Sequence, residues 1–155
     1  MANLNDKFDV LRGWEPGGDA GVDQSLVPLK VGEVAVTLLP GNIVVPDSNG
    51  EVDVATTPAS VALGTANIPT VYVVVEGNGV DTSSVATDKV VCLRGKLTVR
   101  TDKLKAAQTF AVGSAVSYDA GLLQDKAAVA TTHQIGTVLA NNVATDGTID
   151  VELDL

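Results

Sequence analysis

Over most of the chain, apolar and polar residues follow one another in short runs that have the period of β-strands. Residues 31–38 alternate, with every second side chain from Val34 to Leu38 apolar, which is the pattern of a half-buried strand. Residues 149–153 alternate in the same way, with acidic residues between the apolar ones. This run predicts a strand with an acidic outer face. Residues 71–75 are continuously apolar, so we expect both faces of that strand to be buried.

Turns that contain glycine separate these runs and predict hairpins. Arg94-Gly95 lies between the strand-like segments 89–93 and 96–100, and this spacing favours a hairpin. Asp119-Ala120-Gly121 and Asp146-Gly147 stand between later pairs of segments. Glycine suits these positions because tight turns need positive φ values.

The number and spacing of the segments predict an all-β fold. About ten short strands at this spacing are typical of a small β-barrel or a β-sandwich built of short hairpins. The one helix that the sequence favours is Thr101–Gln108, where Thr101 is a candidate N-cap.

Two parts of the sequence resemble one another. Gly41–Asp47 and Gly113–Asp119 have the same Gly-to-Asp spacing, and each is followed by a turn and then by Val-Ala-Thr-Thr, at 54–57 and at 129–132. The lengths between these features differ. The sequence therefore leaves open whether the chain contains a duplication or only hairpins that use the same residues.

The first 25 residues differ from the rest, because they are acidic, contain Glu15-Pro16-Gly17-Gly18 and have few strand signals. We expect residues 1–25 to form an extended N-terminal arm and residues 26–155 to form a single β domain. Hydrophobic side chains in the arm are suited to dock on a partner or to pack on the domain's own core, and the sequence leaves both open. These candidate partner-binding residues are Phe8, Val10, Leu11 and Trp14.

Composition limits the kinds of partner. Of the 155 residues, 45% are hydrophobic but only 3% are aromatic, so the core must be aliphatic. Ten basic and nineteen acidic residues give a net charge of −9, which argues against nucleic acid and anionic membranes as partners. No apolar run approaches the roughly 20 residues of a membrane span. Cys92 is the only cysteine, which excludes a disulfide within the chain and fits synthesis in a reducing cytoplasm.

Few residues are candidates for catalysis or for metal binding. His133 is the only histidine, Cys92 lies in an apolar run, and Gly77-Asn78-Gly79 lacks the rest of a dinucleotide-binding motif. The acidic turn at 47–53 has its glycine in the wrong place for a calcium-binding loop. We therefore expect no catalytic residue, no metal site and no cofactor, and we expect that the protein is not an enzyme.

Several segments resemble the head-decoration, or cement, proteins of tailed bacteriophages. Segment 41–52, Gly-Asn-Ile-Val-Val-Pro-Asp-Ser-Asn-Gly-Glu-Val, is similar to a motif common in that group, and so is segment 112–122. The closing segments 135–139 and 146–153 also fit the group. Residues 1–25 match no motif of these proteins, and the resemblance covers roughly residues 30–155.

The resemblance implies a structural virion protein. Proteins of this group bind the outside of an expanded capsid at symmetry axes or subunit junctions, and they clamp neighbouring major capsid subunits. The resemblance thus implies the major capsid protein as partner and self-association, with a trimer favoured and a dimer possible. It also implies a place on the capsid exterior after synthesis in the host cytoplasm, with neither nucleic acid nor a membrane as partner.

Other functions remain open on the sequence alone. The chain is also compatible with another virion part, such as a head fibre base, a minor capsid protein or a tail component. A carbohydrate-binding or adhesion module would use an aromatic residue such as Trp14 or Tyr72 to contact the sugar. An enzyme would have to rely on His133.

Overall fold

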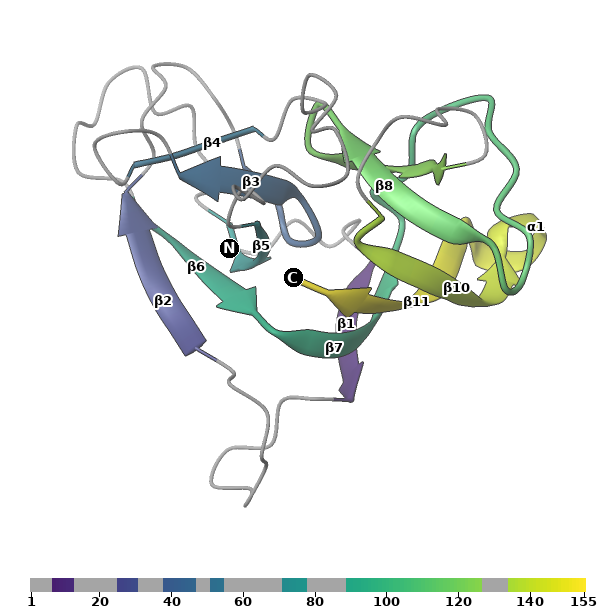
Figure 1. The fold of residues 1–155 in the computed structure, drawn as a ribbon, viewed down its shortest axis with the longest axis horizontal. Coiled ribbons are helices and arrows are strands. Elements are labelled where there is room, and N and C mark those ends of the chain that lie inside the picture. Colours follow the sequence, from purple (N-terminus) through teal and green to yellow (C-terminus); the bar gives the residue numbers. More distant parts are fainter. Residues whose placement is uncertain are drawn as a thin grey trace, which may run out of the picture.

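The protein is described by a computed structural model, which places residues 7–12, 25–30, 38–46, 51–54, 71–77, 89–126 and 134–155. Within these ranges the chain forms eleven strands and one helix of four residues. The strands make two antiparallel sheets, and neither sheet closes on itself (Figure 1). The prediction of an all-β fold is confirmed, in the form of two open sheets.

The first sheet has six strands in the order β1-β7-β11-β10-β8-β9. In that order the strands are Phe8–Arg12, Lys96–Thr101, Thr148–Asp154, Gly136–Asn142, Ala115–Asp119 and Leu122–Asp125. The second sheet has five strands in the order β2-β6-β5-β3-β4. These are Ser25–Lys30, Lys89–Arg94, Tyr72–Glu76, Ile43–Pro46 and Val52–Val54.

The chain passes from one sheet to the other at Gly95, so the hairpin predicted around Arg94-Gly95 is wrong. β6 pairs with β2 and β5 in the five-stranded sheet, whereas β7 pairs with β1 and β11 in the six-stranded sheet. Gly95 has a φ of 119°, which favours glycine because it has no Cβ. In Figure 1, β6 runs on into β7 as one bent ribbon. Such bends form the corners of packed sheets.

The helix predicted at Thr101–Gln108 is also wrong. Thr101 ends β7, and its Oγ1 accepts a hydrogen bond from the Lys103 amide at 3.0 Å. The backbone of the next residues then bonds to β9, where the Leu123 carbonyl accepts from the Lys105 amide at 2.8 Å. Local helix propensity is therefore overridden by pairing with a distant strand. The helix in the described ranges is α1, Val143–Asp146, between β10 and β11.

Two clusters of buried side chains stabilise the sheets. The larger cluster, called here the shared core, takes residues from both sheets, among them Val73 from β5 and Val151 from β11. The second cluster, on the opposite face of the five-stranded sheet, consists of Leu38, Val44, Val52, Val74, Val90 and Cys92, with Tyr72 packed against it. Val73 and Val74 thus point to different clusters, which confirms that both faces of this strand are buried.

The two sheets repeat one arrangement, beginning with a turn at equivalent positions. The amide of Asn42 donates to the carbonyl of Leu39, and the amide of Ser114 donates to that of Ala111, both at 3.0 Å. The third residue of each turn is a glycine with positive φ, 90° at Gly41 and 84° at Gly113. Each glycine amide then donates to a valine carbonyl of the neighbouring strand in its sheet. Gly41 donates to Val74 on β5 and Gly113 to Val138 on β10, both at 2.8 Å. A Gly residue is required in both turns for the same conformational reason.

The repeat extends to all five strands. The order β2-β6-β5-β3-β4 in one sheet corresponds to β7-β11-β10-β8-β9 in the other. The irregularities correspond as well, since the β5–β6 register shifts between Val74 and Glu76, and the β10–β11 register between Val138 and Ala140. We call β2 to β6 the first unit and β7 to β11 the second unit. The Gly41–Asp47 and Gly113–Asp119 segments are thus equivalent parts of a structural duplication.

The two Val-Ala-Thr-Thr segments, at 54–57 and 129–132, are not equivalent in this structural duplication. Val54 in β4 pairs with Val44, and the equivalent pair in the second unit is Asp125 with Val116. The counterpart of Val54 is therefore Asp125. Residues 55–57 and 129–132 lie outside the described residues, so this likeness has no structural counterpart among them.

The two units pack head to tail, which means that each unit contributes a different one of its two faces to the shared core. Val74 and Cys92 of the first unit lie in the second cluster, but their equivalents, Val138 and Val151, lie in the shared core. The first unit reaches the shared core with its opposite face, which includes Val73. The corresponding face of the second unit is consequently turned away from the shared core. On β10 and β11 this face is the candidate functional surface.

Candidate binding face

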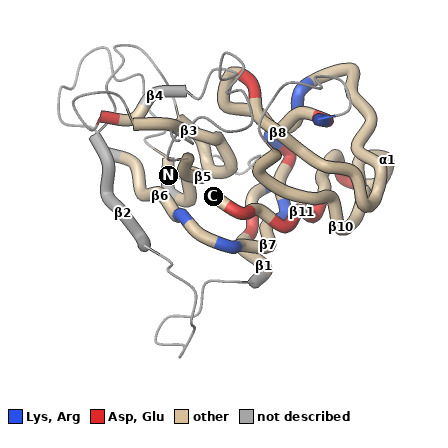
Figure 2. Tube along the Cα trace, viewed as in Figure 1, with Lys and Arg blue, Asp and Glu red and all other residues tan. Residues whose placement is uncertain are grey.

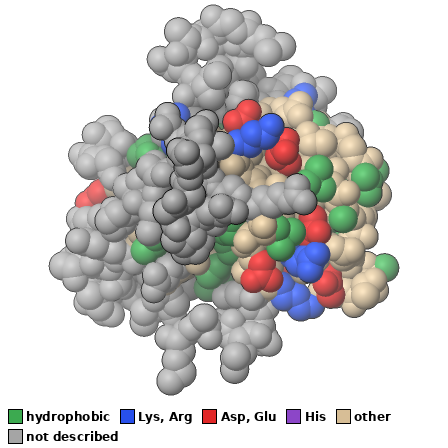
Figure 3. Space-filling view, turned by 90° about the horizontal axis from the view of Figure 1, so that it is seen from below, with side chains coloured by type: hydrophobic (Ala, Val, Ile, Leu, Met, Phe, Trp, Pro, Cys, Tyr) green, Lys and Arg blue, Asp and Glu red, His purple; other side chains and the backbone are tan. Residues whose placement is uncertain are grey.

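The face of β1, β7, β11 and β10 that points away from the shared core mixes charged and apolar side chains. It is called here the outer face. Seen from below, its described part has acidic, basic and hydrophobic side chains close together (Figure 3). The outer face consists of Asp9 and Leu11 on β1, Lys96, Thr98 and Arg100 on β7, Asp150, Glu152 and Asp154 on β11, and Thr137 and Leu139 on β10.

The centre of the outer face is a strip of opposite charges on β7 and β11, which lie side by side (Figure 2). Arg100 donates from Nε to Asp150 Oδ1 at 2.7 Å and from Nη2 to Asp150 Oδ2 at 2.9 Å. The hydrogen bond and the charge of Asp150 raise the pKa of Arg100 above its ordinary value. This two-bond geometry fixes both side chains. The predicted strand with an acidic outer face is confirmed at β11.

A second ion pair is looser and more exposed. Lys96 Nζ lies 3.3 Å from Glu152 Oε1, and the two side chains are 59% and 44% exposed. Exposed pairs of this kind contribute little to stability, because water screens them. Lys96 and Glu152 are therefore available to exchange partners, whereas Arg100 and Asp150 are held in place.

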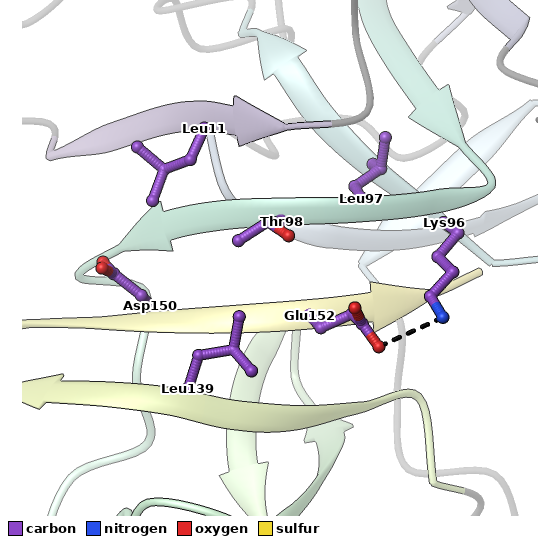
Figure 4. A pocket seen from close by; sticks show the side chains of 7 residues that line it. All are labelled: Leu11, Lys96, Leu97, Thr98, Leu139, Asp150 and Glu152. Atoms are coloured by element: carbon purple, nitrogen blue, oxygen red, sulfur yellow. Dashed lines mark ion pairs between the residues drawn. The ribbon is translucent and has the colours of Figure 1, made fainter. Parts of the chain in front are cut away.

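Two leucines flank the charged strip, and each is the extra residue of a β-bulge. Leu11 lies where the β1–β7 register shifts between Val10 and Arg12, and Leu139 is the extra residue on β10. They are 43% and 47% exposed. Bulges re-aim side chains, and Figure 4 shows the two leucines on either side of the strip. The strands that carry them are three strand spacings apart, which corresponds to about 14 Å.

The outer face is hollowed between these leucines. One hollow of about 610 Å³ is lined by Leu11, Lys96, Leu97, Thr98, Leu139, Asp150 and Glu152 (Figure 4). A neighbouring hollow of about 490 Å³ is lined by Lys96, Gln134, Ile135, Gly136, Thr137, Glu152 and Asp154. Lys96 and Glu152 line both hollows, so the two hollows form one groove that this ion pair interrupts. We call the two hollows together the groove.

The chain was compared with protein-family models, with curated proteins and with solved structures. None of these comparisons finds a match. In the described part of the chain, no helix is long and apolar enough to cross a membrane. The function is therefore argued from the residues and the geometry of the outer face.

The structure separates the four candidate residues of the predicted arm. Residues 8–12 form β1 and pair with β7, with Phe8 opposite Thr101. Phe8 and Val10 are partly buried and pack against the shared core, as in the alternative where this region folds onto its own domain. Leu11 points into the groove, and Trp14 lies outside the described residues. β1 is thus a strand of the six-stranded sheet.

Of the residues that line the groove, the sequence interpretation gave only Leu11 as a binding residue, and Leu139 is among those that it missed. Leu139 follows Val138, so the pair breaks the alternation of β10. A break of this kind is the signal of a bulge. It does not say which of the two residues is buried, and here Val138 is buried while Leu139 is exposed.

The residues considered for catalysis are not among the described residues that line the groove. Cys92 is fully buried in the second cluster, and burial raises the pKa of its thiol to about 12. The thiolate is the reactive form, so Cys92 acts as a small apolar side chain. His133 lies outside the described residues. In the ranges that the structure describes, no three His, Cys, Asp or Glu side chains are grouped so that they could hold a metal ion.

Proposed function

We propose that this chain is a structural virion protein that decorates the outer surface of a tailed-phage capsid. In this proposal it acts without catalysis or a cofactor, and it stabilises the shell by clamping neighbouring major capsid subunits. The first support is the resemblance to cement proteins. Its segments fall in both units, since residues 41–52 include β3 and the start of β4, and residues 112–122 include β8. The resemblance thus involves the repeated hairpin.

The observation that carries the proposal is the composition of the outer face. Two exposed leucines lie on either side of ion-paired side chains on the six-stranded sheet. Contact surfaces between proteins that also exist separately combine apolar anchors with a polar surround. A hollowed sheet face of this kind is suited to bind another protein surface.

Charge supports a protein partner rather than a polyanion. Among the side chains that the structure describes on the outer face, Asp9, Asp150, Glu152 and Asp154 outnumber the basic Lys96 and Arg100, and the whole chain has a net charge of −9. An acidic protein does not compete for the packaged DNA. Many copies on one shell would each need only modest affinity, because the clamped subunits are held at several points.

Sedimentation of the purified protein with expanded capsid shells tests this proposal. We expect the chain to pellet with shells in a saturable manner and to raise the temperature at which the shells disrupt. In solution we expect a trimer of the 15.8 kDa chain. A protein that neither pellets with shells nor stabilises them would contradict the proposal, and pelleting with tail tubes instead would favour a tail component.

A further inference from the structure

We propose that the groove binds an extended segment of the partner that carries apolar and basic side chains on one face. The inference deepens the proposed function and rests on it for the identity of the partner as the major capsid protein. It places the contact on β1, β7, β10 and β11, and therefore on the sheet itself. Of the three predicted arm residues that the structure describes, Leu11 belongs to it and Phe8 and Val10 do not.

The first argument comes from the duplication within the chain. Leu139 is equivalent to Val75, because each is the extra residue of the corresponding bulge. Val75 packs against the shared core, whereas Leu139 is 47% exposed. One copy of this face is thus already used to bind another sheet. The other copy keeps an aliphatic residue at the same position without a described neighbour to cover it.

The second argument comes from the residues that differ between the two copies. The cross-strand pair of Val73 with Leu93 in the first unit corresponds to Thr137 with Glu152 in the second unit. Val73 and Leu93 are buried in the shared core. Replacing such a pair by polar residues keeps the face soluble while it is free. The second copy is therefore suited to a contact that forms and separates, around an apolar anchor at Leu139.

The third argument is charge complementarity along the groove. In the part of the chain that the structure describes, Asp154 forms no ion pair, and Glu152 has only its exposed contact with Lys96. Carboxylates are thus available at the end of the strip beside the second hollow. Lys or Arg side chains of a partner would pair with them, which favours a basic segment over an acidic one.

The shape of the groove favours an extended segment. The hollow between the leucines leads past the Lys96–Glu152 pair to the hollow beside Asp154. An extended chain places every second side chain on one face, about 7 Å apart. Such a segment would put an apolar side chain between Leu11 and Leu139 and a basic one near Asp154.

The test uses the full chain, expanded shells and matched variants. Leu139→Asp and Leu11→Asp add charge to exposed positions on the outer face, and we expect each to weaken shell binding at least tenfold. Val143→Asp is the control, since Val143 is 45% exposed but lies on α1. Circular dichroism and thermal unfolding should show that all three variants are folded. If both leucine variants still bind shells, the inference that the groove is the binding site is contradicted, while the proposed decoration function is not.

A second measurement does not depend on shells. The ¹⁵N-labelled chain is titrated with a synthetic peptide of three Val-Ser-Lys-Ser repeats, which presents valine and lysine on one face. We expect amide shifts confined to β1, β7, β10 and β11, which Leu139→Asp abolishes, and much smaller shifts with Val-Ser-Glu-Ser repeats. Shifts elsewhere, or equal shifts with the acidic peptide, would overturn the inference. Groove binding of the basic peptide by a protein that ignores shells would instead refute the proposed function.

Discussion

The first and second units show how one backbone arrangement can serve two purposes. In the first unit both faces of the central strands are apolar and buried, as at Val73 and Val74. In the second unit the equivalent outer face of β10 and β11 carries Thr137, Glu152 and the exposed Leu139. Strand order and bulges are the same in both units. The difference therefore lies in the side chains of one face, which is where we place the binding function.

The largest expected effect concerns a strand position whose two copies have different surroundings. Leu153 in β11 is buried in the shared core, and its equivalent in β6 is Arg94, which is exposed. Leu153→Ala should reduce the free energy of unfolding by about 2–5 kcal/mol, because it leaves a cavity. Arg94→Ala should change it by less than about 0.5 kcal/mol. Urea denaturation of both variants checks this, and equal losses would contradict the head-to-tail packing.

The second prediction compares the equivalent turn glycines. A Cβ at Gly41 would lie 2.7 Å from Thr101 Oγ1 and 3.0 Å from Phe8 Cδ2, whereas a Cβ at Gly113 would have no neighbour within 4 Å. Both positions have positive φ, which costs about 1–2 kcal/mol for alanine. Gly113→Ala should show only this cost, and Gly41→Ala should lose about 2–4 kcal/mol by adding a collision. Similar thermal unfolding of the two variants would show that Gly41 is not tightly enclosed by the other sheet.

The third prediction compares the same substitution, to aspartate, at equivalent positions of the two units. Val75→Asp places a charge against the shared core and should reduce the free energy of unfolding by about 1–3 kcal/mol. Leu139→Asp, at the equivalent exposed position, should leave stability within about 0.5 kcal/mol and lower partner binding instead. Chemical denaturation and shell sedimentation measured on both variants separate the two effects. A destabilised Leu139→Asp protein would mean that Leu139 is part of the fold.

The smallest expected effect concerns the connection between β10 and β11. Asp146 Oδ1 accepts hydrogen bonds from the amide and from Oγ1 of Thr148, at 3.0 and 2.5 Å, and these bonds lower the pKa of Asp146. A lowered pKa in the folded state adds stability above the ordinary pKa near 4, which is lost as the pH falls through the folded value. Thr148→Val should raise the pKa of Asp146 in an NMR titration, and Thr137→Val should not. An unchanged pKa would assign the shift to the amide bond alone.

Local patterns predicted those features that depend on neighbouring residues. The acidic outer face of β11 follows from strict alternation, and the β8–β9 hairpin follows from Ala120 and Gly121, which adopt φ values of 50° and 76°. Gly95 shows the limit of such reasoning. A glycine between two strands permits a reversal or a bend, and only the distant partners of β6 and β7 decide between them.

The candidate site was less predictable than the fold. Leu11 was one of four candidate partner-binding residues of the N-terminal region, but its position across the groove from Leu139 depends on β1 pairing with β7. That pairing joins residues about 90 positions apart, and no local pattern specifies it. The duplication was visible at Gly41–Asp47 and Gly113–Asp119 only. Its meaning depends on which face each unit buries, and equivalent residues such as Val74 and Val138 look alike in the sequence.

The claim that the outer face binds a capsid surface is tested most directly by electron cryomicroscopy of shells saturated with this protein. We predict density in which β1, β7, β11 and β10 face the shell, with Leu11 and Leu139 in contact with a major capsid subunit. Density in which the five-stranded sheet faces the shell, with the outer face open to solvent, would contradict the account.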